Sequence, residues 1–349
     1  MSAVRSRYKA IDLFSGCGGL TTGLRAAGFD VLLAVDIDAL AIKCYQLNHK
    51  KTTLWHRDMK TVSGEEILST FNLKPEELDL LAGCPPCQGF SSLRTLNGSR
   101  QVGDIRNDLI SDFGRLSIEL RPKTILMENV PGLENDFRLK RLVDRLRRNG
   151  YKVRWRTLNA ADYGVPQRRR RLILLAALDG HIDFPEPKLS PSSFADVLGD
   201  MPKSGQSGDP AHDHSESRSD KVKMIISKIP KDGGSRSDLE DSEQLRCHKE
   251  TRGFYDVYGR MRLMDVAPTI TSGFLNPSKG RFLHPTENRA ITVREGAILQ
   301  SFPRGYRFPM KAGKYSVATL IGNAVPPAFA AAQALSIRLF LEARINRSG

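Results

Sequence analysis

A series of short apolar runs, separated by helical patterns, constrains the fold of this chain more than any other feature of its sequence. The runs cover residues 8–14, 31–36, 78–83, 124–129, 151–158 and 172–178. Between two of them, residues 137–148 carry Leu139, Leu142, Val143 and Leu146 on one helical face, and the pattern stops at Asn149-Gly150. Strands that alternate with helices form βαβ units. The first half is therefore predicted to be an α/β domain with a mostly parallel sheet covered on both faces.

The composition changes after residue 185. From there to about residue 246 the chain is rich in Pro, Ser, Gly and Asp and weak in periodicity, which is typical of a module built from loops. Regular patterns return in DVAPTITSGFLN and TVREGAILQSFP, and an alanine-rich helix is expected over residues 327–344. The chain is thus predicted to hold a sheet domain and a second, smaller module.

The charge balance indicates a polyanionic partner. Lys and Arg outnumber Asp and Glu by 53 to 39, which gives a net charge of +14 and a pI near 9.7. Such a surplus attracts polyanions through long-range fields and counterion release, so nucleic acid is favoured, with a merely basic enzyme as the alternative. Five cysteines without a repeated spacing favour reduced thiols. The apolar runs are too short for a membrane span and the N-terminus lacks a secretory signal, so a soluble cytoplasmic protein is expected.

The stretch IDLFSGCGGL, residues 11–20, is typical of a strand, a glycine-rich turn and the start of a helix. Gly16, Gly18 and Gly19 let the backbone pass close to a ligand, and the helix directs its positive end toward the turn. Thr21 occupies the third glycine position of the dinucleotide pattern G-x-G-x-x-G, which weakens the case for a pyrophosphate. S-adenosylmethionine, which has no pyrophosphate, suits this loop better; a tight turn without a ligand is the alternative.

Two carboxylates follow the next predicted strands. Asp36 ends one of them, 20 residues after Gly16, where it can accept hydrogen bonds from ribose hydroxyls. Asp58 is expected at the end of a short third strand, facing an adenine edge. Both positions fit a cofactor that carries a nucleoside.

The stretch GCPPCQGFSS, residues 83–92, begins where a predicted strand ends. Open α/β sheets present ligands at the carboxyl ends of their strands, so Cys87 and Glu128 are predicted to reach the same edge. Structural roles are the alternatives, with Cys84 and Cys87 as small buried hydrophobes and Glu128 as a cap for the turn that starts at Asn129. A zinc site would need two further ligands, so no metal is expected. A thioredoxin-like cysteine pair would be expected in a smaller domain.

Four consecutive arginines, residues 168–171, lead directly into a predicted strand. If strand alternation starts within this run, Arg169 and Arg171 point the same way, toward the edge of the sheet. Two guanidinium groups there could hold a phosphate and a base carbonyl. A solvated basic patch is the alternative.

Six stretches resemble the ordered motifs of the C5-cytosine DNA methyltransferases. They are IDLFSGCGGL, GCPPCQGFS, ENVPG, QRRRR, TVREGAILQSFP and IGNAVPP. Each is weak alone, but six in this order over nearly the whole chain form a specific signal. The resemblance implies a Rossmann-like, S-adenosylmethionine-dependent methyltransferase fold with a target-recognition domain as its second module.

The resemblance also implies a covalent mechanism. Cys87, in the Pro-Cys-Gln motif, would attack C6 of cytosine, whereas Cys84 stands where the family often has glycine. Glu128 would meet N3 and the exocyclic amine, and Arg169 and Arg171 would steady the base and its phosphate. The methyl group would pass to C5 of a cytosine flipped out of double-stranded DNA. Residues 89–108 would correspond to the family's loop that closes over the flipped base.

Further site residues follow from the resemblance by position. The expected cofactor contacts are Phe14, Gly16, Gly18, Gly19, Asp36, Ile37, Asp58 and Asn323. The expected substrate contacts are Gln88, Ser91, Asn129 and Thr269. The expected domains are residues 1–185 for catalysis and cofactor binding, 186–311 for target recognition including the hinge, and 312–349 as a segment returning to the catalytic domain. The C-terminal helix should then pack beside the first strands.

Three other functions compete with this interpretation. A tRNA cytosine-5 methyltransferase would carry the same six motifs, although a sizeable recognition module favours DNA. A nicotinamide-dependent dehydrogenase would need the missing third glycine, and a catalytically dead DNA-binding protein would be expected to show damaged motifs. The enzyme is expected to act as a monomer that needs neither a membrane nor physical contact with a cognate restriction endonuclease.

Overall fold

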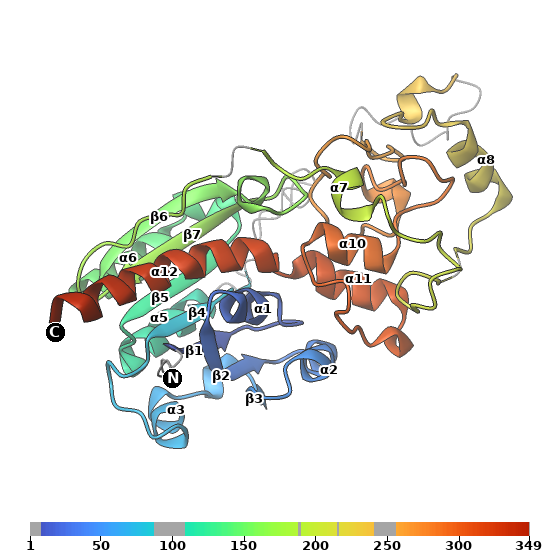
Figure 1. Cartoon of the computed structure of the whole chain (residues 1–349). Coiled ribbons are helices and arrows are strands. Elements are labelled where there is room, and N and C mark those ends of the chain that lie inside the picture. Colours follow the sequence, from blue (N-terminus) through green and yellow to red (C-terminus); the bar gives the residue numbers. More distant parts are fainter. Residues whose placement is uncertain (1–7, 87–108, 188–189, 215, 241–255, 349) are drawn as a thin grey trace, which may run out of the picture. The chain divides into compact units, whose positions relative to one another are not determined.

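The computed structural model describes residues 8–86, 109–187, 190–214, 216–240 and 256–348, with side chains up to residue 345 (Figure 1). Contacts within the chain group the residues into two compact units. The first unit comprises Met1–Tyr163, Arg170–Pro187 and Val325–Gly349, and the second comprises Gly164–Arg169 and Lys188–Ala324. These bounds differ from the expected domains mainly at residues 164–169 and 312–324, because both segments make their contacts within the second unit.

The first unit is built on a seven-stranded sheet with the order β3-β2-β1-β4-β5-β7-β6. Its strands are β1 (Tyr8–Leu13), β2 (Phe29–Asp36), β3 (Thr53–His56), β4 (Leu80–Gly83), β5 (Thr124–Asn129), β6 (Lys152–Asn159) and β7 (Arg170–Ala177). Neighbours among β1 to β5 run parallel, whereas β7 is antiparallel to both β5 and β6. The prediction of a mostly parallel sheet is confirmed. Hydrophobic periodicity carries no information on strand direction, so it did not reveal the reversed β7.

Helices cover both faces of this sheet. They are α1 (Gly19–Ala26), α2 (Ala39–Asn48), η1 (Met59–Thr61), α3 (Gly64–Thr70), α5 (Leu109–Leu120), η4 (Pro131–Asn135), α6 (Phe137–Arg148), η5 (Ala160–Tyr163) and α12 (Pro327–Ser348). Helices α3, α5 and α6 share one apolar core with Ile11 and Leu13 of β1. Figure 1 shows α1 and α12 on the near side of the sheet, with α5 and α6 behind it.

Helix α6 shows how the sequence produces one of these layers. Asp136 caps its start by accepting a hydrogen bond from the Arg138 N–H at 2.9 Å. The four apolar side chains at helical spacing are buried against the sheet, and the chain leaves the helix at Gly150 with a φ of 90°. The predicted bounds of this helix are confirmed.

The last helix, α12, packs against α1 although the two lie at opposite ends of the sequence. A Cβ atom at Gly23 would lie 2.5 Å from the Ala330 Cβ, so glycine permits this close approach. Arg338 Nη1 donates to the Ala27 carbonyl at 3.0 Å.

The stretch Lys314–Ile345 is long and apolar enough to cross a membrane by length and composition alone, and half of its most apolar part is buried within the structure. One such stretch is weak evidence for a membrane span.

The second unit is built mainly from loops and short helices. Its helices are α7 (Phe194–Leu198), α8 (Asp220–Lys228), η6 (Arg236–Asp238), η8 (Pro277–Lys279), α10 (Val293–Leu299), η9 (Met310–Ala312) and α11 (Lys314–Asn323). Within its described residues, strand pairing is limited to isolated bridges such as Arg260 with Leu283. The prediction of a loop-built module after residue 185 is confirmed.

Candidate active site

The glycine-rich loop after β1 bends sharply at the carboxyl-end edge of the sheet. Phe14, the first residue after β1, has a φ of 58°, which is uncommon for a bulky side chain, and Gly16 and Gly18 have φ values of 54° and 92°. A Cβ atom at Gly16 would meet no heavy atom within 4 Å, so the backbone is open to a ligand on that side. Gly19 begins α1, whose amino end follows the loop directly.

Asp36, at the end of β2, holds this loop in place. Its Oδ2 accepts the Gly16 N–H at 2.7 Å and its Oδ1 accepts the Asp38 N–H at 2.8 Å. Burial raises the pKa of the Asp36 carboxyl, and the backbone hydrogen bonds oppose that rise. Each carboxylate oxygen has two lone pairs, so acceptor capacity remains on Asp36 for a ligand hydroxyl.

The neighbouring strand ends supply an apolar side chain and a second carboxylate. Ile37, directly after β2, exposes 63% of its surface, which is unusual for this residue type. Asp58 follows β3 and caps η1, where its Oδ1 accepts the Lys60 N–H at 3.0 Å. An open glycine loop, two carboxylates and an exposed aliphatic side chain fit a cofactor that carries a ribose and a flat base.

Asp12 is a site-region residue that the sequence analysis missed. It is fully buried on β1, where the Thr21 hydroxyl donates to its Oδ2 at 2.6 Å. Burial raises the pKa of Asp12, the Thr21 hydrogen bond lowers it and the nearby Asp36 charge raises it, and together they bring this pKa to about 7. The available signal was a carboxylate inside the apolar run AIDLF, a residue type rarely buried without a reason.

The ends of β4 and β5 form the part of this edge expected to carry the chemistry. The Cys84 N–H donates to the Leu13 carbonyl at 3.2 Å, which extends the pairing of β4 with β1. Asn129 Nδ2 donates to the Pro85 carbonyl at 2.9 Å, so Asn129 ties the β5 end to the Pro-Pro turn. The predicted nucleophile Cys87 and the predicted substrate contacts Gln88 and Ser91 lie outside the described residues.

The Cys84 thiol is a poor candidate for a nucleophile. Burial raises its pKa well above the ordinary thiol value, and the charge of Glu128 raises it further. Because the thiolate is the reactive form, this environment suppresses reactivity at Cys84.

Glu128 and Arg171 pair on adjacent antiparallel strands. Glu128 lies on β5, is 8% exposed and has its Oε1 3.0 Å from Arg171 Nε on β7. The contact is an ion pair without the alignment of a hydrogen bond, and Oε1 has no hydrogen-bond partner within the described residues. The pair therefore leaves hydrogen-bonding capacity on Glu128.

Arg169 contacts a different set of groups. Its guanidinium donates to three backbone carbonyls, those of Ile270 at 3.0 Å, Gly322 at 3.1 Å and Ala324 at 3.2 Å. The expectation that Arg169 and Arg171 follow one strand alternation is wrong, because β7 begins only at Arg170.

Gln167, another residue that the sequence analysis missed, anchors the start of the arginine run. It is fully buried, and its Nε2 donates to the Leu299 carbonyl at 3.0 Å and to Gln300 Oε1 at 2.6 Å. Its own Oε1 accepts the Ile270 N–H at 2.9 Å. No signal in the sequence other than its place before the arginines pointed to this role.

Two predicted contacts lie in the second unit. The Thr269 hydroxyl donates to the Arg168 carbonyl at 2.5 Å, so this side chain holds the arginine run near the Ala267 bridge. Asn323 is exposed and ends α11.

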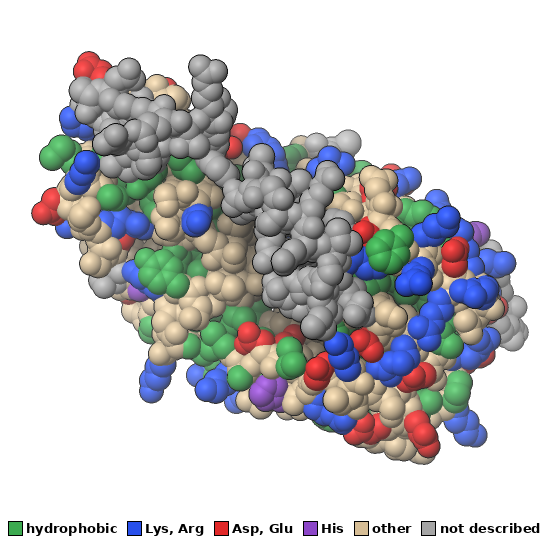
Figure 2. Space-filling model, turned by 180° about the vertical axis from the view of Figure 1, so that it is seen from behind, with side chains coloured by type: hydrophobic (Ala, Val, Ile, Leu, Met, Phe, Trp, Pro, Cys, Tyr) green, Lys and Arg blue, Asp and Glu red, His purple; other side chains and the backbone are tan. Residues whose placement is uncertain are grey.

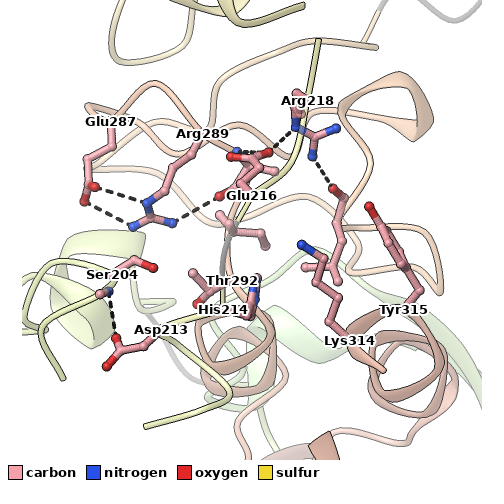
Figure 3. Close-up of a pocket in the computed structure, with 14 residues that line it drawn as sticks. Ser204, Asp213, His214, Glu216, Arg218, Glu287, Arg289, Thr292, Lys314 and Tyr315 are labelled. Atoms are coloured by element: carbon pink, nitrogen blue, oxygen red, sulfur yellow. Dashed lines mark hydrogen bonds and ion pairs between the residues drawn. The ribbon is translucent and has the colours of Figure 1, made fainter. Parts of the chain in front are cut away.

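A separate cavity of about 280 Å³ in the second unit contains none of the predicted site residues (Figure 3). Its charged lining is largely paired internally. Arg218 contacts Glu216, and Arg289 pairs with Glu287 at 3.1 Å. Within the described residues, no group of three or more His, Cys, Asp or Glu side chains could hold a metal ion.

Comparison with known proteins identifies the family. The sequence model described as C-5 cytosine-specific DNA methylase matches residues 8–338. The chain is 36% identical to the Type II methylase M.HgiDII of Herpetosiphon aurantiacus, over 95% of each chain, and 35% identical to the Type II methyltransferase M1.HphI of Haemophilus parahaemolyticus, over 94% of this chain and 86% of that one.

Solved structures agree with this assignment. An E. coli prophage protein described as a DNA modification methyltransferase aligns with a TM-score of 0.70 and 26% identity, covering 96% of this chain and 99% of that one. DNMT2 of Spodoptera frugiperda, at 19% identity and a TM-score of 0.64 over 95% and 99% of the two chains, shares the fold. The expected resemblance and fold class are thereby confirmed. The chain belongs to the C-5 cytosine-specific DNA methylase family and is a DNA cytosine methyltransferase.

Proposed function

We propose that this enzyme methylates C5 of a cytosine flipped out of double-stranded DNA, through a transient bond between Cys87 and C6. The observation that supports this most is the ion pair of Glu128 and Arg171 at the strand edge, beside the turn that leads to Cys87. Flipping a base out of the duplex costs a few kcal/mol of lost stacking and pairing, but it exposes C6 and N3 to side chains at such an edge.

S-adenosylmethionine is the proposed cofactor, and when bound it supplies an electrophilic methyl group. The open loop at Gly16, Gly18 and Gly19, with the Asp36 carboxylate, would hold its ribose and amino-acid portions. Phe14, Ile37 and Asp58 would contact its adenine, and Asn323 would complete the set. The exposure of Ile37 supports this role, since an aliphatic side chain gains by covering a flat base.

Cys87 is the proposed nucleophile. Its thiolate adds to C6 of cytosine, and the electron pair of the C5–C6 bond then makes C5 able to take up the methyl group. Loss of the C5 proton to a base re-forms the double bond and expels the Cys87 thiolate. Thiols are nucleophilic even when only a few per cent are ionised, which suits attack on an unactivated ring.

Glu128 would donate or share a proton at N3 as the thiolate adds, so that negative charge does not accumulate on the ring. General acid catalysis of this kind contributes roughly a hundredfold to ten-thousandfold. Arg171 would orient Glu128 and the base carbonyl. The carbonyl contacts of Arg169 favour a positioning role for that residue, because it connects the backbone at Ile270 with the backbone at Gly322.

Target choice is proposed to reside in the second unit, where Thr269 would support the recognition segments. Gln88, Ser91 and Asn129 would contact the substrate strand beside the nucleophile. We also propose that the enzyme works as a cytoplasmic monomer that needs no membrane and no physical contact with a restriction endonuclease. Sedimentation of the full chain with and without a short duplex would give one protein per duplex if this is correct.

The substrate class is tested by incubating the enzyme with tritiated S-adenosylmethionine and either plasmid DNA or tRNA. Label is expected in DNA, since the matched relatives at 30–36% identity are Type II methyltransferases. A duplex that carries 5-fluorocytosine is expected to form a complex resistant to denaturant, because the C5 fluorine cannot leave as a cation. Label in tRNA alone would overturn the DNA assignment, and absence of the trapped complex would overturn the covalent mechanism.

A further inference from the structure

More than half of the chain's net positive charge lies in one short segment. Residues 137–159 contain nine Lys and Arg residues and one acid, a net charge of +8, against +14 for the whole chain. This segment comprises helix α6 and strand β6, both in the first unit. The mechanism proposed above uses none of these side chains.

The outer face of α6 presents most of its cations to solvent, with Arg145 half-buried. Arg141, Arg145 and Arg148 follow one another at helical spacings of four and three residues, and Lys140 and Arg147 lie in the neighbouring row. We call these five side chains, with the exposed Lys152 of β6, the α6–β6 surface. Figure 2, which views the molecule from the side of α6, shows Lys and Arg side chains gathered over this region at the right.

Two exposed aromatic residues lie among these cations. Phe137 exposes 54% and Trp155 exposes 37% of its surface. The guanidinium of Arg141 lies 5.7 Å from the centre of the Phe137 ring, and that of Arg147 lies 5.8 Å from the Trp155 ring. Stacking of a guanidinium on an exposed ring leaves its N–H groups free to contact a phosphate.

Structural roles account for only part of this charge. Basic residues in the last turn of a helix stabilise it by interacting favourably with the helix dipole, and this role accounts for Arg145, Arg147 and Arg148. Ion pairs neutralise two other cations of the segment, Arg138 by Asp136 and Arg154 by Asp183. Within the described residues, the six members of the α6–β6 surface have no carboxylate partner in an ion pair, and Asp144 is the one acid on α6 that offsets their mutual repulsion.

The α6–β6 surface extends away from the edge that carries the proposed chemistry. Helix α6 follows η4, which begins just past the carboxyl end of β5, where Glu128 lies. The helix then runs back along the sheet for about 18 Å, so that Arg148 and Lys152 lie at the opposite edge, where β6 begins. DNA held at the catalytic edge would therefore leave these cations available to another polyanion.

We propose that the α6–β6 surface binds the sugar-phosphate backbone of a second duplex segment, and that this contact lets the enzyme pass directly from one DNA segment to another. The proposal rests on the action of the chain on DNA. It identifies a second DNA contact, which reads no sequence because exposed Lys and Arg side chains on a convex helix contact phosphates only.

The test measures how fast the enzyme leaves a fluorescent target duplex as unlabelled competitor duplex is added. Direct transfer makes the observed dissociation rate rise with competitor concentration, whereas dissociation into solvent does not. The variant Arg141→Gln/Arg148→Gln removes two cations from one helical row and keeps helix propensity. Lys50→Gln/Lys51→Gln removes the same charge from exposed positions between α2 and β3 and serves as the matched control.

The wild-type rate is expected to rise with competitor, and the α6 variant is expected to lower that dependence about fivefold or more, while the control variant retains it. The salt dependence of competitor-driven dissociation should also fall by about two units of log–log slope in the α6 variant. Equal dependence in the α6 variant and the control, or no dependence in the wild type, would overturn the proposal. Methylation of a short duplex by both variants at the wild-type rate is expected, and a wild-type enzyme that fails to methylate that duplex would count against the proposed function alone.

Discussion

The two compact units hold their polar side chains by different physical means. In the first unit, polar residues such as Asp36 and Glu128 stand where buried strands end, and backbone ladders fix their positions. In the second unit, the backbone is held by buried side chains that donate to carbonyls, as Gln167 and Arg260 do. The difference teaches that a sheet positions polar side chains through its main-chain hydrogen bonds. A loop-built module depends instead on single buried polar side chains to hold its backbone. Catalysis and stability should therefore respond differently to substitution in the two units.

Replacing the proposed nucleophile should have the largest effect. We expect Cys87→Ser to lower methyl transfer at least about ten-thousandfold, because a serine hydroxyl is scarcely ionised near neutral pH. Cys84→Ser should retain transfer, because burial already keeps that thiol protonated. The measurement is incorporation of tritiated methyl groups into DNA. Comparable loss of methyl transfer in both variants would show that the two cysteines act as a pair. It would contradict the assignment of Cys87 alone as the nucleophile.

A smaller loss is expected from Glu128→Gln, which keeps shape but cannot deliver a proton. The turnover number should fall roughly a hundredfold to ten-thousandfold. Glu134→Gln, an exposed position six residues further on, is the matched control and should leave turnover unchanged. Single-turnover kinetics on a saturating duplex would measure the chemical step directly. An active Glu128→Gln enzyme would mean that strand-end placement does not imply a role in proton transfer.

The same distinction between backbone ladders and single polar side chains separates what the sequence predicted from what it missed. Periodicity predicted the strands and the bounds of α6, because a buried ladder imposes a repeating apolar pattern. It also placed Glu128 at the sheet edge. It missed Asp12, whose raised pKa depends on burial. It also missed the partners of Arg169, which lie 101 to 155 positions away in the sequence. Local patterns carry no information on such long-range side-chain contacts.

The second unit should be the more sensitive to loss of one buried polar side chain. Arg260 is fully buried, and its guanidinium donates to the carbonyls of Ile226, Ile229, His284 and Glu287 and to the Asn288 side chain. Arg260→Met keeps the aliphatic stem but leaves five acceptors without this donor. We expect the free energy of unfolding of the second unit to fall by about 3 kcal/mol or more.

Arg262→Met, at an exposed position two residues away, is the matched control and should change the free energy of unfolding by less than about 0.5 kcal/mol. Denaturant unfolding gives the magnitude, and hydrogen exchange of α8 locates it, because Arg260 bonds to two carbonyls at that helix. A small effect of Arg260→Met would show that the loops are held by apolar packing, such as the cluster around Ile226 and Leu283, and not by polar side chains.

Asp12 should produce the smallest effect, and one that depends on pH. Its folded-state pKa of about 7 lies above the unfolded value of 3.8, so the folded state binds the proton more tightly. The stability from that proton is fully present below about pH 4 and is lost as the pH rises toward 7. Between pH 5 and 7 the wild type should therefore lose roughly 2 kcal/mol more than Asp12→Asn, which cannot ionise. Denaturant unfolding at several pH values measures this slope. Parallel pH profiles for the two proteins would mean that Asp12 is solvated or paired when charged, and that even a strand inside the sheet can accommodate a charge without cost.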